Sequence, residues 1–90
     1  MWEELGPVQI VAERLATLYA DEVSLRRLLA LARVDAGRIP FDGRASNMAW
    51  FAAVEAARQG RLRHLVEVML EEYALDPWLV AVYARWQGGR

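Results

Sequence analysis

The stretch from Ser46 to Gly60 reads SNMAWFAAVEAARQG and decides the fold. Apolar residues occupy nearly every side of a helix drawn through it, which is typical of a helix surrounded by other elements. We therefore expect this helix to be the central, most buried one, with Trp50 in the core. Ser46 or Asn47 is expected to cap its start, and Gly60 stands where glycine commonly ends a helix.

Two long helices and one short helix are predicted before this stretch. Residues 7–20 form the first, because proline fits the first helical turn and the apolar residues that follow have helical spacing. Asp21 caps a second helix that runs to about Val34. Residues 35–39 allow one more turn, a short third helix, because Pro40 prevents its continuation.

Two more helices are predicted after Gly60. The first covers residues 61–73, buries Tyr73 with its other apolar residues and points its glutamates outward. The next is opened by the Asp-Pro pair at 76–77 and continues to Trp86, with apolar residues at helical spacing. Residues 87–90 are expected to be a linker or a frayed end.

The pattern as a whole predicts an all-α protein, a compact six-helix antiparallel bundle with one short third helix. A chain of 90 residues forms a single domain, and we place its core within about residues 8–86. The hydrophobic content of 56% is enough for such a small core. Helical chains of this size fold readily because most of their contacts are local.

Composition excludes several classes of protein. The chain has no cysteine, which excludes a disulfide scaffold and removes the thiolates of most structural zinc sites. Its acidic start does not resemble a signal peptide, and charged residues interrupt every apolar run well before the ~20 residues of a membrane span. We therefore expect a cytoplasmic protein that does not bind membranes.

Charge is unevenly distributed along the chain although its net value is only −1. Residues 1–25 are acidic and contain a single arginine, whereas residues 26–63 hold eight arginines and only three carboxylates. No lysine is present. Since arginine pairs carboxylates through two parallel hydrogen bonds, this pattern favours contacts with other proteins.

The residue types needed for catalysis are scarce. His64 is the only histidine, and Ser24 and Ser46 are expected at helix caps. The residues needed to form a Ser-His-Asp triad are therefore not expected to come together. Glu71 and Glu72 are adjacent and point about 100° apart on a helix, which does not make a paired-carboxylate site. We expect neither enzymatic activity nor a metal or other cofactor.

A helix-turn-helix DNA-binding regulator is the alternative interpretation. The helices on either side of Gly60 could form such a motif, and Arg58, Arg61 and Arg63 gather there. The second helix, however, continues into three glutamates that would repel phosphates, and the net charge is not basic. Protein binding without nucleic acid is therefore the preferred interpretation.

Several segments, taken in order, resemble the bacterial effector-associated domain of type 1. They are residues 38–45 (RIPFDGRA), Trp50, residues 55–62 (EAARQGRL), residues 70–73 (LEEY) and residues 76–77 (DP). The resemblance covers roughly residues 8–86. Ala74 departs from the family, which often has proline after the tyrosine, and this departure is expected to lengthen the fifth helix slightly.

The resemblance implies a death-like fold and a role in bacterial conflict and immune signalling. Domains similar to this one act as adaptors that dock onto domains of the same type, on a second copy or on a protease, TIR or NACHT-type protein. A homo-oligomer is one expected outcome. Two unlike faces on one rigid body would permit such head-to-tail contacts.

Charge and aromatic character select the candidate interface residues. The basic candidates lie on the second helix and the segment after it: Arg26, Arg27, Arg33, Arg38 and Arg44. The acidic candidates lie on the fifth helix: Glu67, Glu71 and Glu72. Trp78 is either a core residue or an exposed aromatic anchor, and we take it as the aromatic interface candidate because tryptophan is enriched at binding hot spots. We expect the basic and acidic groups to occupy different faces.

Overall fold

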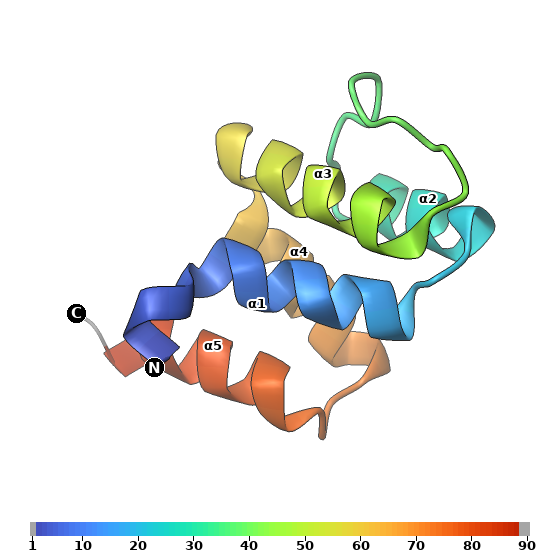
Figure 1. Ribbon diagram of the computed structural model, residues 1–90. Coiled ribbons are helices and arrows are strands. Elements are labelled where there is room, and N and C mark those ends of the chain that lie inside the picture. The colour runs from blue at the N-terminus through green and yellow to red at the C-terminus, as the bar shows by residue number, and fades with distance from the viewer. Residues whose placement is uncertain (1, 89–90) are drawn as a thin grey trace.

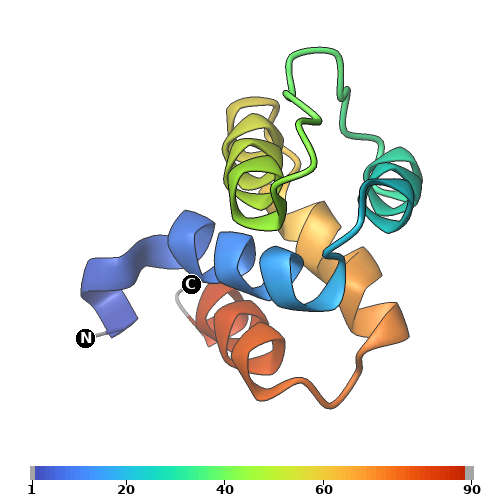
Figure 2. The same cartoon turned by 45° about the vertical axis from the view of Figure 1, so that its right-hand side comes forward.

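The computed structural model describes residues 2–88, with side chains from residue 6 to residue 86. This part of the chain is all-α and has five helices. They are α1 (Trp2–Leu18), α2 (Glu22–Leu31), α3 (Ala45–Arg58), α4 (Leu62–Glu72) and α5 (Pro77–Gly88). α1 lies between α3 and α5, and both run opposite to it (Figure 1). α4 crosses behind them and contacts α2, α3 and α5 (Figure 2).

The first helix is bent near its start. Gly6 has φ 72° and ψ 156°, which lie outside the helical region, so the long straight part of α1 begins at Pro7. This agrees with the predicted start, and the helix ends at Leu18, two residues before the predicted end. The conformation of Gly6 suits glycine because it has no Cβ to clash at positive φ.

Three predicted helix boundaries are confirmed by their hydrogen bonds. The Asp21 carboxylate accepts from the Ser24 amide at 2.9 Å at the start of α2. The Asp76 carboxylate accepts from the Leu79 amide at 3.0 Å at the start of α5. At the end of α3, Gly60 has φ 74°, and the amide that follows it donates to the Ala56 carbonyl at 2.7 Å. This is the Schellman arrangement, which satisfies helix carbonyls that would otherwise lack partners.

The predicted short third helix is absent, so the bundle has five described helices and not six. Residues 35–39 hold a single turn in which the Ile39 amide donates to the Ala36 carbonyl at 3.1 Å. The side chain of Gln59 accepts from the Asp35 amide at 2.8 Å and donates to the Asp35 carbonyl at 2.9 Å. These backbone groups are therefore satisfied by a distant side chain rather than by a helix.

The start of α3 also differs from the prediction. The helix begins at Ala45, and the Met48 amide donates to the carbonyl of Arg44, so Ser46 and Asn47 lie inside the first turn. Asp42 orders this start from outside the helix. Its carboxylate accepts from the Arg44 amide at 3.0 Å and from the Asn47 side-chain amide at 2.8 Å.

The core is formed by aliphatic side chains from all five helices. Its largest fully buried members are Ile10, Leu15, Leu25, Leu28, Leu29, Met48, Leu65, Met69 and Leu79. An ion pair joins α1 to the start of α5, where Arg14 donates to Asp76 at 2.7 Å. Asp76 therefore both caps α5 and fixes that helix against α1.

Two aromatic side chains predicted to be buried are not. Trp50 is 45% exposed, so α3 is not surrounded on all sides. Its buried face is a stripe of small residues, Ala49, Ala52, Ala53 and Ala56, which leaves the bulky side chain pointing outward. Tyr73 is also exposed and meets Tyr19 edge-on, with ring centroids 5.7 Å apart. α4 ends at Glu72, so Ala74 does not lengthen it.

Two leucines of α2 test this division between core and surface. Leu28 is fully buried and Leu31 is 53% exposed. We expect Leu28→Ala to lower the free energy of unfolding by about 2–5 kcal/mol, through lost burial and the cavity left behind. Leu31→Ala is the matched control and should change it by less than about 0.5 kcal/mol. Urea unfolding followed by circular dichroism measures both, and equal losses would contradict the packing of α2.

Candidate functional site

One predicted basic residue and one predicted acidic residue, Arg27 and Glu72, contact each other within the chain. Arg27 of α2 donates to both carboxylate oxygens of Glu72 at the end of α4, at 2.7 and 3.1 Å. The Tyr19 hydroxyl donates to the same carboxylate at 2.5 Å. Since α2 packs against α4, helices far apart in sequence place opposite charges side by side. Arg27 and Glu72 are therefore partners of each other within the chain.

This contact strongly changes the protonation of its members. Hydrogen bonds from Arg27 and then from Tyr19 lower the pKa of the Glu72 carboxyl to about 2. Burial raises the pKa of the Tyr19 hydroxyl, and its hydrogen bond to Glu72 raises it further. Both shifts favour an ionised Glu72 and a neutral Tyr19 at neutral pH.

Two other predicted basic residues also have partners in the chain. Arg26 pairs with Glu22 one turn earlier on α2, with 2.6 Å between Nε and a carboxylate oxygen. Its guanidinium lies 3.8 Å from the centre of the Phe41 ring, a cation–π contact that holds the segment after α2 against the helix. Arg44 pairs with Asp42 at 3.1 Å, at the start of α3.

Glu67 of α4 is at the centre of a cluster between α4 and α5. It accepts a hydrogen bond from the Tyr83 hydroxyl at 2.8 Å, and Arg63 lies 3.8 Å away. His64 is 3.4 Å from the same carboxylate. The bond from Tyr83, followed by the bond from His64, lowers the pKa of the Glu67 carboxyl. Glu67 is thus mainly a link between two helices.

The remaining candidates have no partners among the described residues 2–88. The side chains of Arg33, Arg38 and Glu71 are exposed and form no hydrogen bond or ion pair there. Arg61, which was not selected as an interface residue, is in the same situation. Trp78, on the first turn of α5, is 48% exposed. These side chains are the ones whose interactions remain available to another molecule.

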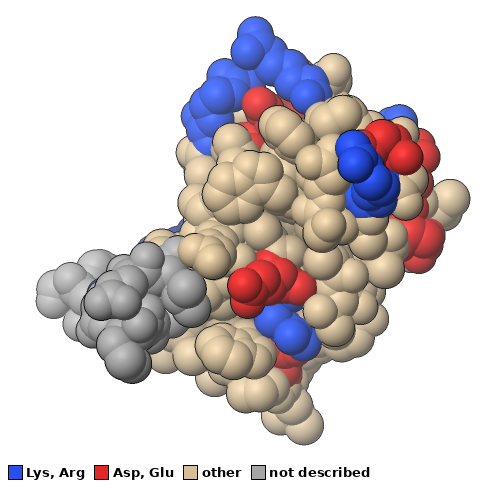
Figure 3. Space-filling model, viewed as in Figure 1, with Lys and Arg blue, Asp and Glu red and all other residues tan. Residues whose placement is uncertain are grey.

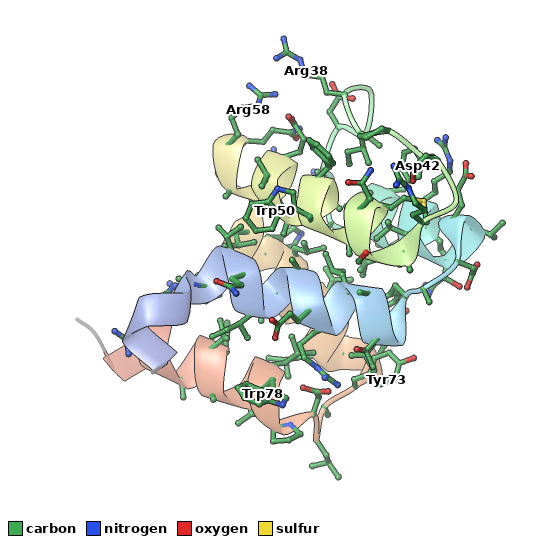
Figure 4. The ribbon with its side chains drawn as sticks, in the orientation of Figure 1. Arg38, Asp42, Trp50, Arg58, Tyr73 and Trp78 are labelled. Carbon is green, nitrogen blue, oxygen red and sulfur yellow. The ribbon has the colours of Figure 1, made fainter. Side chains whose placement is uncertain are left out.

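One end of the molecule is rich in arginine. Figure 4 shows Arg38 and Arg58 close to this end, and Figure 3 shows arginine atoms gathered there above a largely uncharged face. Arg58 donates to Glu55 at 2.7 Å, and Gln59 also donates to Glu55, at 3.2 Å. Hydrogen bonds from Arg58 and Gln59 lower the pKa of the Glu55 carboxyl. Glu55 is thus committed to Arg58 and Gln59, and Arg38 extends beyond this network.

A groove of about 450 Å³ lies between α1 and α3 on the face shown in Figure 3. Its walls are Gln9, Ala12, Glu13 and Ala16 of α1, with Ser46 and Trp50 of α3. The Glu13 side chain forms no hydrogen bond or ion pair within the described chain. The groove therefore combines an exposed indole, small apolar walls and an uncommitted carboxylate.

Sequence reasoning missed this groove because it placed Trp50 in the core. A usable signal was present: four alanines recur at the helical positions 49, 52, 53 and 56, and they define the buried side of α3. Trp50 lies about 100° from Ala49 around the helix and falls outside that stripe. The partner helix, and hence the role of Glu13, is decided by tertiary packing alone.

The arginines that suggested a helix-turn-helix motif are mostly engaged with carboxylates. Arg58 pairs with Glu55, and Arg63 lies near Glu67. Arg61 alone among the three has no carboxylate partner in the described chain. A DNA-binding surface would need several cations directed at phosphates, so these pairs favour protein binding over nucleic-acid binding.

Within residues 2–88, histidine and carboxylate side chains nowhere form a group of three that could hold a metal ion. None of the helices in that range combines the length and the apolar character that crossing a membrane requires.

Comparison with protein families identifies one that matches nearly the whole chain. The family described as effector-associated domain 1 matches residues 3–87. The chain belongs to this family. A search of curated proteins and a search of solved structures returned no match. The match confirms the family that the sequence resemblance indicated. The surfaces described above therefore belong to an effector-associated domain.

The Glu72 contact gives this effector-associated domain a predictable dependence on pH. The pKa of Glu72 is lower in the folded chain, about 2, than its ordinary value of 4.5. The folded state therefore binds fewer protons, and the contact's stabilisation is present above pH 4.5 and lost as the pH falls towards 2. We expect Glu72→Gln to lower stability at neutral pH and to flatten part of this acid dependence.

Urea unfolding between about pH 2 and pH 7 measures this effect. Glu71→Gln is the matched control, because it makes the same change one residue earlier where the side chain has no partner in the described chain. Its profile should follow that of the wild type. Coincident profiles for all three proteins would show that Glu72 does not stabilise the fold.

Proposed function

We propose that this effector-associated domain is a protein-interaction adaptor that docks onto domains of its own type. Its partners are a second copy, or such a domain on a protease, TIR or NACHT-type protein of a bacterial conflict system. It acts by binding, without catalysis and without a cofactor, in the cytoplasm. The match to the effector-associated domain 1 family over residues 3–87 carries this proposal.

Features of the exposed surface support docking. Arg33 and Arg38 are exposed cations without carboxylate partners in the described chain. Large apolar side chains are exposed as well, among them Trp50 and Trp78. Aromatic and arginine side chains are the types most enriched at interface hot spots. The surface that we propose for docking is smaller than the sequence indicated, since Arg26, Arg27, Arg44, Glu67 and Glu72 have partners within the chain.

A single polar contact between two such domains is weak. An exposed ion pair contributes about 0.2–1 kcal/mol, which is too little to hold two proteins together. Several contacts on each copy, repeated in an assembly, raise the effective affinity without stronger individual contacts. Such assembly would concentrate the effectors attached to the domains, and it would respond sharply to the amount of protein.

Self-association of the chain tests this proposal. We expect sedimentation velocity to show species larger than the monomer, in amounts that rise with protein concentration. High salt should weaken the association, because it screens contacts between exposed charges. A chain that stays monomeric up to millimolar concentration, at low salt, would contradict docking between copies.

Trp78 tests the contribution of the exposed aromatic surface. We expect Trp78→Ala to weaken self-association by at least about tenfold, as for an interface anchor that loses its buried contacts. Leu75→Ala removes an apolar side chain that is 92% exposed in the loop before α5, and it should have an effect of less than about twofold. Circular dichroism checks that both variants are folded. Equal effects would show that Trp78 is not an anchor.

A further inference from the structure

The groove between α1 and α3 has the chemistry of a site for an arginine side chain. Trp50 supplies an indole face, on which a guanidinium stacks favourably. Glu13, on the opposite wall, supplies a carboxylate, which a guanidinium binds through two parallel hydrogen bonds. Ala12 and Ala16 keep the floor small and apolar, which suits the aliphatic stem of arginine.

Arg38 is an exposed cation that is well presented to another molecule. It lies in the loop between α2 and α3, which extends beyond the helices, and Figure 4 shows its side chain pointing away from them. The loop is held on both sides of Arg38. Gln59 bonds the backbone of Asp35, the Gly37 amide donates to the Asp35 carboxylate at 3.0 Å, and Ile39 is buried in the core.

This support lowers the cost of binding. A side chain carried by an ordered loop loses less conformational freedom when it docks than one on a flexible segment. Arg38 forms no ion pair or hydrogen bond in the described chain, so docking breaks no existing contact of its side chain. Its charge contributes to lowering the pKa of Glu55, but that carboxylate is already bonded by Arg58 and Gln59.

We propose that Arg38 of one copy docks into the Trp50–Glu13 groove of a second copy. The inference rests on the proposed function and names the contact through which two domains meet. Complementary charge selects the occupant: an uncommitted carboxylate in the groove and an uncommitted guanidinium on the extended loop. Arg38 and the groove are different parts of the surface, so the contact is head-to-tail when two copies make it once and two-fold when they make it reciprocally.

A head-to-tail contact has a consequence for assembly. When Arg38 of the first copy fills the groove of the second, the groove of the first and Arg38 of the second remain free. Further copies add at both ends, and the product is a ring or a helical filament, depending on the rotation between neighbours. Where the same two copies make the contact reciprocally, each with Arg38 in the groove of the other, the product is instead a closed two-fold dimer.

Exchange of the two charges tests the contact. Glu13→Arg and Arg38→Glu should each weaken self-association by at least about tenfold, because each places like charges opposite one another. The chain that carries both substitutions should associate to within about threefold of the wild type, since the pair is restored in reverse. An equimolar mixture of the two single variants should also associate, since each then meets an opposite charge.

Matched controls separate this contact from general effects of charge. Arg61→Glu and Glu71→Arg make the same changes at exposed side chains that also lack partners in the described chain and do not line the groove. They should change association by less than about threefold. Trp50→Ala should weaken it, and Trp50→Phe, which keeps an aromatic face, should weaken it less. Circular dichroism and urea unfolding check that each variant is folded. Glu13→Gln and Arg38→Gln replace the charge reversals where a reversal prevents folding.

The outcomes distinguish this inference from the proposed function. If the wild type associates and the Glu13 and Arg38 variants behave like their controls, the contact is wrong and docking between copies stands. If both single variants weaken association but neither the double variant nor the mixture restores it, the two side chains do not meet. A wild type that never associates would overturn both the contact and the homotypic function.

Discussion

The close approach of α1 to α3 is the constraint on which the rest of the structure depends. Four of the six buried residues of α3 are alanines, at positions 49, 52, 53 and 56, and these small side chains allow the two helices to pack tightly. Among the described helices, the contact between α1 and α3 is the most extensive. Once this face is buried, Trp50 has to lie on the outside, and the groove beside it follows from the same packing.

The other helices complete the core around this pair. α5 covers the far side of α1, and the ion pair between Arg14 and Asp76 fixes its start. α4 closes the bundle and brings Glu72 to Arg27, so that a charge pair distant in sequence stabilises the fold. Tertiary packing therefore pairs one of the predicted basic residues with one of the predicted acidic residues.

The charged side chains without partners in the described chain include one on the loop between α2 and α3 and one in the groove between α1 and α3. Arg38 is an uncommitted cation whose side chain points away from the helices (Figure 4), and Glu13 is an uncommitted carboxylate in the groove. A surface in which most ions are paired internally offers few polar contacts to a partner, and each of those is correspondingly specific. Under the proposed function, weak and specific contacts repeated between copies would produce a concentration-dependent assembly.

The sequence by itself determined the elements that depend on local chemistry. Helix starts at Asp21 and Asp76 and the end of α3 at Gly60 were predictable, because capping and positive φ are properties of a few adjacent residues. The all-α class and the family could be inferred for the same reason, since periodicity and the order of motifs are local features of the chain.

Tertiary structure decided everything that depends on distant residues. Gln59 replaced the predicted short helix by bonding the backbone of Asp35, 24 positions away. Trp50 became exposed because the alanine stripe, and not the indole, lies on the buried side of α3. Arg27 lost its place on a separate basic face because α4 lies beside α2. Hydrophobic and charge patterns indicate whether a side chain favours burial or an ion pair. The residue that it contacts is determined only by how the helices pack.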